Sequence, residues 1–206
     1  MAASQNGFHP VIKMPEEYWV FDFTRGEDVS WNCPFPYQVG RYNEYRPGMY
    51  TTDLFGGVRD IHVGIDIGAP IDTEIHAFAD GIIHSFGINA EAGSYGPTII
   101  TEHNIALPIG VGSEKLHPHQ KVWALHGHLS SESIENLEVG SSFQAGDIIA
   151  KVGNEEVNGG WPPHIHFQLS LTKPETHDLP GVVESEERES ALLRFPDPRL
   201  VLGLLY

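Results

Sequence analysis

The chain has 206 residues, which suits one domain, or two at most, with a core large enough to need no disulfide. Its 12 basic and 28 acidic residues give a net charge of −16, and phosphate backbones repel so acidic a chain, so nucleic acid is not an expected partner. No apolar run approaches the ~20 residues that cross a bilayer, so no membrane span is predicted. The one cysteine, Cys33, excludes an internal disulfide and a cysteine-based zinc cluster.

The N-terminal residues contain neither the basic nor the apolar region of a secretory signal. We therefore expect the protein to act in the cytoplasm, with the periplasm as the alternative if the chain was trimmed. Residues 1–55 are rich in proline and aromatic residues, among them Trp19, Trp31, Phe35 and Tyr37. We expect this segment to be an irregular lead-in that packs on the rest of the fold.

Beyond the lead-in, short runs of β-branched residues bounded by Gly, Pro, Asn or Asp predict an all-β domain. Helices are expected only at 131–137 and at 184–193. The predicted organisation is the lead-in 1–55, a β-rich domain over 56–175, and a C-terminal tail over 176–206 that packs on this domain and contains a short helix. The expected strands cover 61–67, 74–78, 81–86, 98–102, 121–128, 148–152 and 164–171.

Within the strand expected at 61–67, His62 and Asp66 share the face opposite to the alternating Ile and Val residues. In a fully extended strand these two side chains would stand about 13 Å apart, too far to hold one metal ion. A shared metal site therefore requires a bend between them, which Gly64 allows.

Two more histidine pairs have the i, i+2 spacing that places side chains on one face of a strand. His164 and His166 form one pair in the last expected strand, and His126 and His128 form the other at a strand end. Histidines with an aspartate and no cysteine suit a catalytic zinc, which takes three protein ligands and keeps one position open for water.

These motifs resemble those of the lysostaphin-type zinc endopeptidases, also called β-lytic or glycyl-glycine endopeptidases. The resemblance rests on H-x-x-x-D at His62 and Asp66, on H-L at His128, and on H-x-H at His164 and His166, in that order along the chain. It covers about 60–170 and implies a β-sandwich of the duplicated hybrid motif type. The flanks 1–55 and 171–206 are similar to a domain that some bacteria fuse to a phosphotransferase and an aminotransferase.

The resemblance also implies roles for individual residues. His62, Asp66 and His166 are expected to bind one Zn²⁺ per chain, while His128 and His164 act on the water and the tetrahedral intermediate. The implied activity is hydrolysis of peptide bonds in peptidoglycan fragments or small peptides. Because the sequence has no H-E-x-x-H, a histidine is the expected general base. His126 stands where the family commonly has a tyrosine and is a secondary candidate.

Two other interpretations remain open. His126, His128 and Glu132 fit an H-x-H-x-x-x-E pattern, which would suit a cupin-like non-haem iron enzyme. The chain could also be a non-catalytic binding module on the same scaffold, since a fold does not fix a function. Bound iron with oxygen uptake would favour the first alternative, and metal binding without turnover would favour the second.

Overall fold

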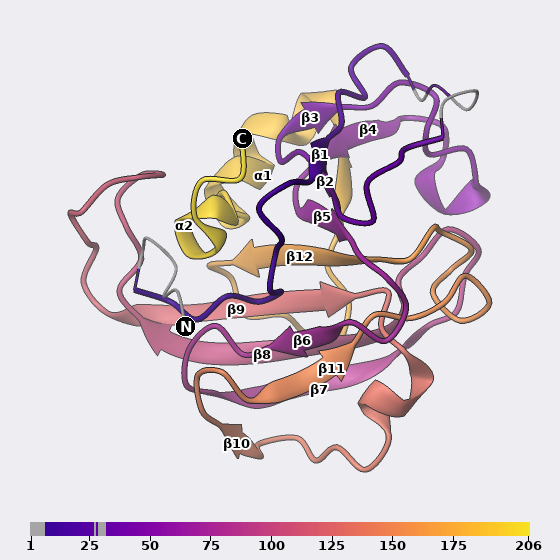
Figure 1. Cartoon of the computed structure of the whole chain (residues 1–206). Coiled ribbons are helices and arrows are strands. Elements are labelled where there is room, and N and C mark those ends of the chain that lie inside the picture. The colour runs from indigo at the N-terminus through magenta and orange to yellow at the C-terminus, as the bar shows by residue number, and fades with distance from the viewer. Residues whose placement is uncertain (1–6, 27, 29–31) are drawn as a thin grey trace.

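Three β-sheets form the framework of the computed structural model, which describes residues 7–26, 28 and 32–206 (Figure 1). Trp31 of the lead-in lies outside the described residues. A two-stranded sheet pairs β6 (Glu74–His76) with β11 (Ile148–Lys151), and a three-stranded sheet has the order β13 (Val182–Glu184), β4 (Arg59–His62), β3 (Glu44–Tyr45). The eight-stranded sheet has the order β1 (Trp19–Val20), β2 (Gln38–Gly40), β5 (Ile65–Gly68), β12 (His164–Ser170), β9 (Gln120–Gly127), β8 (Gly96–Ile105), β7 (Gly81–Asn89), β10 (Ser142–Phe143).

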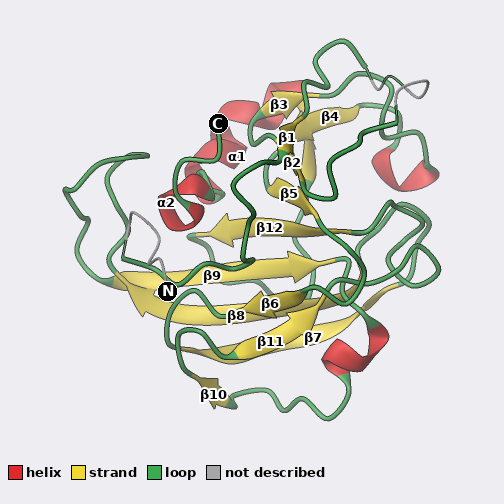
Figure 2. Ribbon diagram, viewed as in Figure 1, coloured by secondary structure: helices red, strands yellow, loops and turns green. Residues whose placement is uncertain are grey.

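The all-β prediction is confirmed, because strands dominate and every helical segment is short (Figure 2). The lead-in is largely irregular, as expected, although it contributes β1, β2 and β3. The helix expected at 131–137 is reduced to one 3-10 turn, and Asn136 just after it adopts a left-handed backbone with φ 58°. The helical segments are η1 (Asp53–Phe55), η2 (Ser131–Ile134), η3 (Ser185–Glu187), α1 (Arg188–Arg194) and α2 (Arg199–Leu202). No helix among the described residues has the length and apolar character to span a membrane.

The segment predicted as one strand at 61–67 is in fact two strands that belong to different sheets. β4 ends at His62 and pairs with β3 and β13, whereas β5 begins at Ile65 and pairs with β2 and β12. The bend between them falls at Val63 and Gly64, where the sequence predicted it. The alternating pattern continues through the bend because each half of the segment buries its apolar residues in a different core.

The first core lies between the large sheet and the β6–β11 sheet. It contains Ile65 and Ile67 of β5, with Ile165 and Phe167 of β12. The lead-in and the C-terminal tail also reach this core, through Val11, Ile12, Leu200 and Val201.

The second core lies on the opposite face of the large sheet. Ile61 and Val63 join it from β4, Leu125 joins it from β9, and Ala191 and Phe195 join it from the C-terminal tail. Side chains alternate along a strand, so the residues of β12 that alternate with Ile165 and Phe167 point toward the second core. His164, His166 and Gln168 are those residues, and the candidate site is built there.

His126 lies in the first core and not on the side of the second core. Its ring packs edge-on against Phe167, with ring centroids 5.3 Å apart, and the residue is fully buried. Among the described residues, neither ring nitrogen of His126 has a partner that meets hydrogen-bond geometry. Burial lowers the pKa of His126 from 6.5 to about 3, so this imidazole stays neutral in the folded protein near neutral pH.

This buried histidine should make the fold sensitive to acid. The unfolded chain takes up a proton at His126 near pH 6.5, but the folded chain resists protonation until about pH 3. The free energy of unfolding must therefore fall as the pH drops from 6.5 toward 3, by about 2 kcal/mol at pH 5 for this group alone. The free energy of unfolding can be measured with urea at pH 8 and at pH 5. Its decrease between these two pH values should be smaller in His126→Phe than in the wild type, by about 2 kcal/mol.

The control for this measurement is His117→Gln, which changes a histidine at an exposed loop position. This variant should lose as much stability between pH 8 and pH 5 as the wild type does. An equal loss in His126→Phe and the wild type would contradict the assignment of a neutral buried imidazole at position 126.

Candidate metal centre

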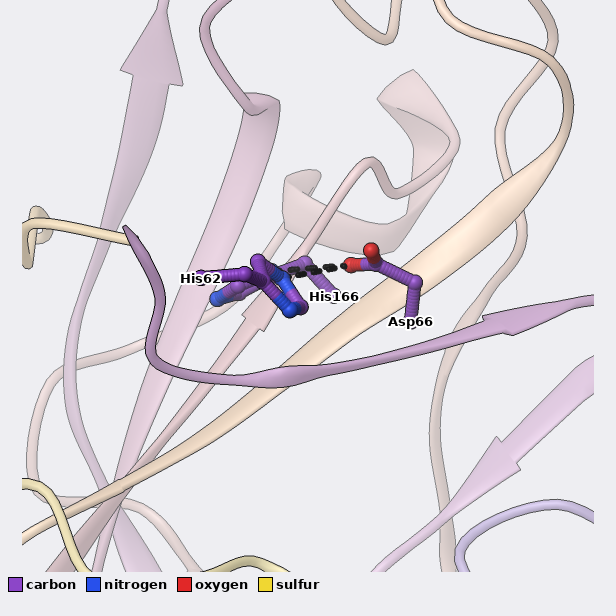
Figure 3. A group of neighbouring side chains, drawn as sticks. All are labelled: His62, Asp66 and His166. Carbon is purple, nitrogen blue, oxygen red and sulfur yellow. Dashed lines mark hydrogen bonds and ion pairs between the residues drawn. The ribbon is translucent and has the colours of Figure 1, made fainter. Parts of the chain in front are cut away.

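Three side chains converge where β4, β5 and β12 meet (Figure 3). The Nε2 atom of His62 lies 3.1 Å from Nδ1 of His166 and 3.2 Å from Oδ1 of Asp66. Nδ1 of His166 lies 3.0 Å from the same Asp66 oxygen. Four ligands arranged tetrahedrally at ~2.0–2.1 Å from a zinc ion stand roughly 3.3 Å apart, so these three atoms have nearly the spacing of zinc ligands.

Hydrogen bonds on the outer side of the two imidazoles orient their lone pairs toward this point. Nδ1 of His62 lies 2.9 Å from the carbonyl oxygen of Arg41 and therefore carries the proton, which leaves Nε2 as an acceptor. Nε2 of Gln168 donates to the carbonyl of Pro180, so its Oε1 faces Nε2 of His166 at 3.0 Å. His166 thus donates from Nε2 and directs the lone pair of Nδ1 toward the centre, as a metal-binding histidine requires.

His128 and His164 stand beside these three residues. Their ring centroids lie 4.1 Å apart with the ring planes tilted by 38°, and Nε2 of His164 lies 3.8 Å from Oδ1 of Asp66. Nδ1 of His128 donates to the carbonyl of Asn158 at 2.7 Å, and Nδ1 of His164 donates to the carbonyl of Pro162 at 2.7 Å. Both rings therefore keep Nε2 free as a proton acceptor next to the candidate metal position.

A reversal of the backbone turns His128 toward this centre. Strict alternation along β9 would direct His128 toward the first core, like His126. His128 instead adopts the left-handed conformation, with φ 63°, and lines the cavity of the site. The i, i+2 spacing thus brings His164 and His166 to one site but separates His126 from His128.

The second oxygen of Asp66 is held by an arginine from the lead-in. Nη1 of Arg46 donates to Oδ2 of Asp66 at 2.7 Å, and only 3% of the Arg46 side chain is exposed. Burial alone would raise the pKa of Asp66, but His62 and Arg46 outweigh it and hold this pKa well below its usual range. Asp66 is therefore a carboxylate over the whole physiological pH range.

Three histidines of the site, His62, His128 and His164, have pKa values that are lowered chiefly by burial. Burial, together with the positive charge of Arg46, lowers the pKa of His62 to about 4. Burial also lowers the pKa of His164, and that of His128 lies well below the usual value because of burial and its neighbour His164. Neutral imidazoles can coordinate a metal or accept a proton at neutral pH, which imidazolium ions cannot do.

A cavity of about 650 Å³ opens over these residues, within the usual range of sites for small ligands. The lead-in contributes many of the residues that line this cavity, with Phe21, Phe23 and Tyr50 among them. Trp161 lines it from the segment before β12, and its ring lies 6.1 Å from that of Tyr50. A ligand at the centre would therefore share the cavity with aromatic side chains of the lead-in and with Trp161.

The donor set fits a zinc ion. It consists of two imidazole nitrogens and one carboxylate oxygen, with two further histidines beside them, and this is the ligand chemistry of catalytic zinc sites. Within the described parts of the chain, these three residues are the one group of histidines, cysteines and acidic residues spaced to hold a metal ion. A cupin-like iron site would need His126, His128 and Glu132 together. These three residues do not meet, because His126 is in the first core and Glu132 is exposed.

The sequence analysis did not identify the hydrogen-bond partners of the residues at the centre. Gln168 follows His166 at the strand period, so its position on the same face was predictable, although its hydrogen bond to the imidazole was not. Arg46 precedes Asp66 by 20 residues and forms no motif with it. The carbonyl groups of Arg41 and Asn158 act through the backbone, which no pattern of side chains reveals.

A family profile and several solved structures are similar to this chain. Residues 60–177 match the sequence profile of Peptidase family M23. The solved structures similar to this chain include a mutant of the catalytic domain of EnpA, a prophage-encoded M23 protein from Enterococcus faecalis, at 23% identity over 73% of this chain and 90% of that one, with a TM-score of 0.46. They also include the catalytic domain of lysostaphin from Staphylococcus simulans, at 24% identity over 73% and 90% of the two chains, with a TM-score of 0.44.

A zinc-containing peptidase from Vibrio cholerae is similar at 21% identity over 63% of this chain and 32% of that one, with a TM-score of 0.44. No curated protein matches the chain. The match to a peptidase family, together with the spacing of His62, Asp66 and His166 for a metal ion, supports a protein of the metallopeptidase class. Because the profile matches more than half of its residues, this chain belongs to Peptidase family M23.

The close approach of β4–β5 to β12 gives a test of this geometry. A Cβ atom on Gly64 would overlap the imidazole of His166 and lie 3.1 Å from the carbonyl oxygen of Phe167. Gly64→Ala should therefore displace the His166 ring and weaken zinc binding by about 10–100-fold, as measured by competition with a chromogenic chelator.

The matched control is Gly110→Ala, since a Cβ atom at Gly110 would meet no atom within 4 Å. This variant should bind zinc like the wild type. If Gly64→Ala also bound zinc like the wild type, the packing of this bend against His166 would not be needed to hold the centre together.

Proposed function

We propose that this protein is a zinc metallopeptidase that hydrolyses peptide bonds in small peptides or peptidoglycan fragments, with a histidine as general base. The single observation that carries the proposal is the common orientation of four imidazoles. His62, His128, His164 and His166 each donate one ring N–H to an oxygen on the outside of the site. The other nitrogens of His62, His164 and His166 lie 3.2, 3.8 and 3.0 Å from Oδ1 of Asp66, an arrangement that calls for a cation at its centre. The ring of His128 packs beside that of His164.

In this proposal, His62, Asp66 and His166 hold one zinc ion. Zinc bound there would polarise the carbonyl group of the substrate and lower the pKa of a water molecule. Nε2 of His164 and Nε2 of His128 are the free proton acceptors beside that position. One of them would take the proton of the attacking water, and the protonated ring would then donate a hydrogen bond to the oxyanion as negative charge develops.

The position of the lead-in along the cavity favours a substrate of limited size. Residues of this segment line the same cavity as the histidines, so the peptide would bind in contact with both the lead-in and the zinc. The aromatic rings of Phe21, Phe23 and Tyr50 offer apolar surface to an extended peptide or to one of its side chains. A cavity of this kind suits a short peptide or a soluble fragment.

A set of single variants should separate metal binding from chemistry. His62→Ala, Asp66→Ala and His166→Ala should lose most of their zinc and the stability that comes with it. His128→Ala and His164→Ala should keep close to one zinc per chain, while their turnover falls by ~10²–10⁴, because each loses a general base or an oxyanion donor. The measurements are zinc stoichiometry by elemental analysis and hydrolysis of purified peptidoglycan and of short peptides that contain Gly or D-Ala.

His126→Ala serves as the comparison within the same motif, and its turnover per folded molecule should stay near that of the wild type. Zinc loss in His128→Ala as complete as in His62→Ala would overturn the assignment of ligands. A wild-type chain that binds zinc but hydrolyses none of these substrates would favour the non-catalytic binding module.

A further inference from the structure

Residues 41–46 of the lead-in contact two of the three proposed zinc ligands, although they lie outside the region 60–177 that matches the family profile. The carbonyl of Arg41 accepts the hydrogen bond from Nδ1 of His62. The guanidinium of Arg46 donates to Oδ2 of Asp66 at 2.7 Å. The lead-in therefore contributes directly to the layer of groups that surrounds the metal ligands.

The hydrogen bonds of Arg46 all lead to groups of the protein itself. Nε donates to Oε2 of Glu44 at 3.0 Å, Nη1 donates also to the hydroxyl of Tyr50 at 3.0 Å, and Nη2 donates to the carbonyl of Arg41 at 3.3 Å. The guanidinium also packs over the ring of Phe23, 5.1 Å from its centroid. All three nitrogens of this side chain are hydrogen-bonded within the protein and only 3% of it is exposed, so it is not placed to receive a carboxylate of the substrate.

Glu44 fixes Arg46 from the other side. Only 4% of Glu44 is exposed, and its Oε1 accepts hydrogen bonds from Nε of Arg41 at 2.8 Å and from the backbone N–H of Phe23 at 3.2 Å. A buried ion pair stabilises little by itself, because desolvation offsets the attraction, but its fixed geometry can define the position of a third group. Here the third group is the carboxylate of Asp66.

The backbone of β2 closes tightly over this contact. A Cβ atom on Gly40 would lie 2.7 Å from Nη2 of Arg46 and 3.0 Å from Oδ2 of Asp66. The strand thus leaves room for the guanidinium and the carboxylate but for no additional atom. With Oδ2 held in this way, Oδ1 is the Asp66 oxygen that faces His62 and His166.

We propose that Arg46 is a positioning residue for the metal centre, which fixes the Asp66 carboxylate so that Oδ1 alone faces the zinc, while Glu44 holds Arg46 in place. This inference rests on the proposed zinc site. It assigns to the lead-in a part in metal binding and not only in lining the cavity.

The test compares zinc affinity in the full-length wild type, Arg46→Met and Arg46→Lys, by chelator competition. Arg46→Met should weaken zinc binding by about 10–100-fold, the usual effect of losing a partner of a metal ligand. Arg46→Lys keeps the charge but lacks the planar fork that reaches Asp66 and Glu44 together, so its affinity should be intermediate. Lys121→Met removes an ion-paired cation from the far end of β9, 2.6 Å from Glu102, and should bind zinc like the wild type.

A second readout separates positioning from a purely structural role. Each variant is melted with and without zinc, and the rise in Tm that zinc produces is compared. A merely structural arginine would lower both melting temperatures and leave the rise unchanged, whereas a positioning residue should reduce the rise itself. If Arg46→Met does not fold, Arg46→Lys decides on the same two measurements.

Three results would overturn the inference. A folded Arg46→Met with a zinc Kd within about twofold of the wild type would do so while leaving the proposed function intact. So would an unchanged rise in Tm in the folded variant. A wild-type chain that binds no zinc at all would overturn the proposed function and the role of Arg46 with it.

Discussion

The position of the Asp66 carboxylate is the constraint on which the rest of the candidate centre depends. This side chain is 19% exposed and carries a full negative charge, so it requires partners that replace water. Arg46 is the partner of Oδ2, and the metal ion proposed at His62 and His166 would be the partner of Oδ1. The two oxygens therefore have different partners, and the carboxylate can satisfy both only in one orientation.

That orientation follows from the way the chain passes from one sheet to another. His62 ends β4 in the three-stranded sheet and Asp66 lies in β5 of the large sheet, so both flank the same bend. Ile61 and Val63 are anchored in the second core, and Ile65 and Ile67 in the first. Since close-packed cores hardly deform, the relative position of the two polar residues is fixed by apolar residues on either side of them.

Strand patterns in the sequence allowed the all-β fold and the grouping of His62, Asp66, His164 and His166 to be anticipated, whereas the place of His128 beside them was implied only by the family resemblance. The period of two in β12 places Ile165 and Phe167 on one face of the sheet and His164 and His166 on the other. A shift of the strand by one residue would exchange the two faces, so the apolar pair fixes the register. The spacing of His62 and Asp66 required a bend, and Gly64 marked it. The division of one predicted strand between two sheets was not predictable, because both halves show the same alternation while burying different cores.

The partners of these residues could not be predicted, because they depend on contacts between distant segments. Arg46, Glu44 and the carbonyl of Arg41 reach the centre only after β3 has paired with β4 and β2 with β5. The lead-in is irregular over most of its length and offers little periodicity to interpret. Charged residues in such a segment are usually solvated, and nothing in the local sequence distinguishes a buried Arg46 from an exposed one.

The contrast between His126 and His128 shows how a strained backbone conformation places a side chain in the candidate site. A histidine in the left-handed conformation costs about 1–2 kcal/mol relative to an ordinary one, and such strain persists only where neighbouring contacts impose it. His128 has those contacts: its N–H donates to the carbonyl of Tyr95 at 2.8 Å, its carbonyl accepts from Gly153 at 2.9 Å, and its ring donates to Asn158. The strain and its supports have one visible effect, which is to move this imidazole from the side of the first core to the side of Asp66. His126, two residues earlier in an unstrained strand, stays where alternation puts it, and this is why a motif of two histidines yields one residue for the core and one for the site.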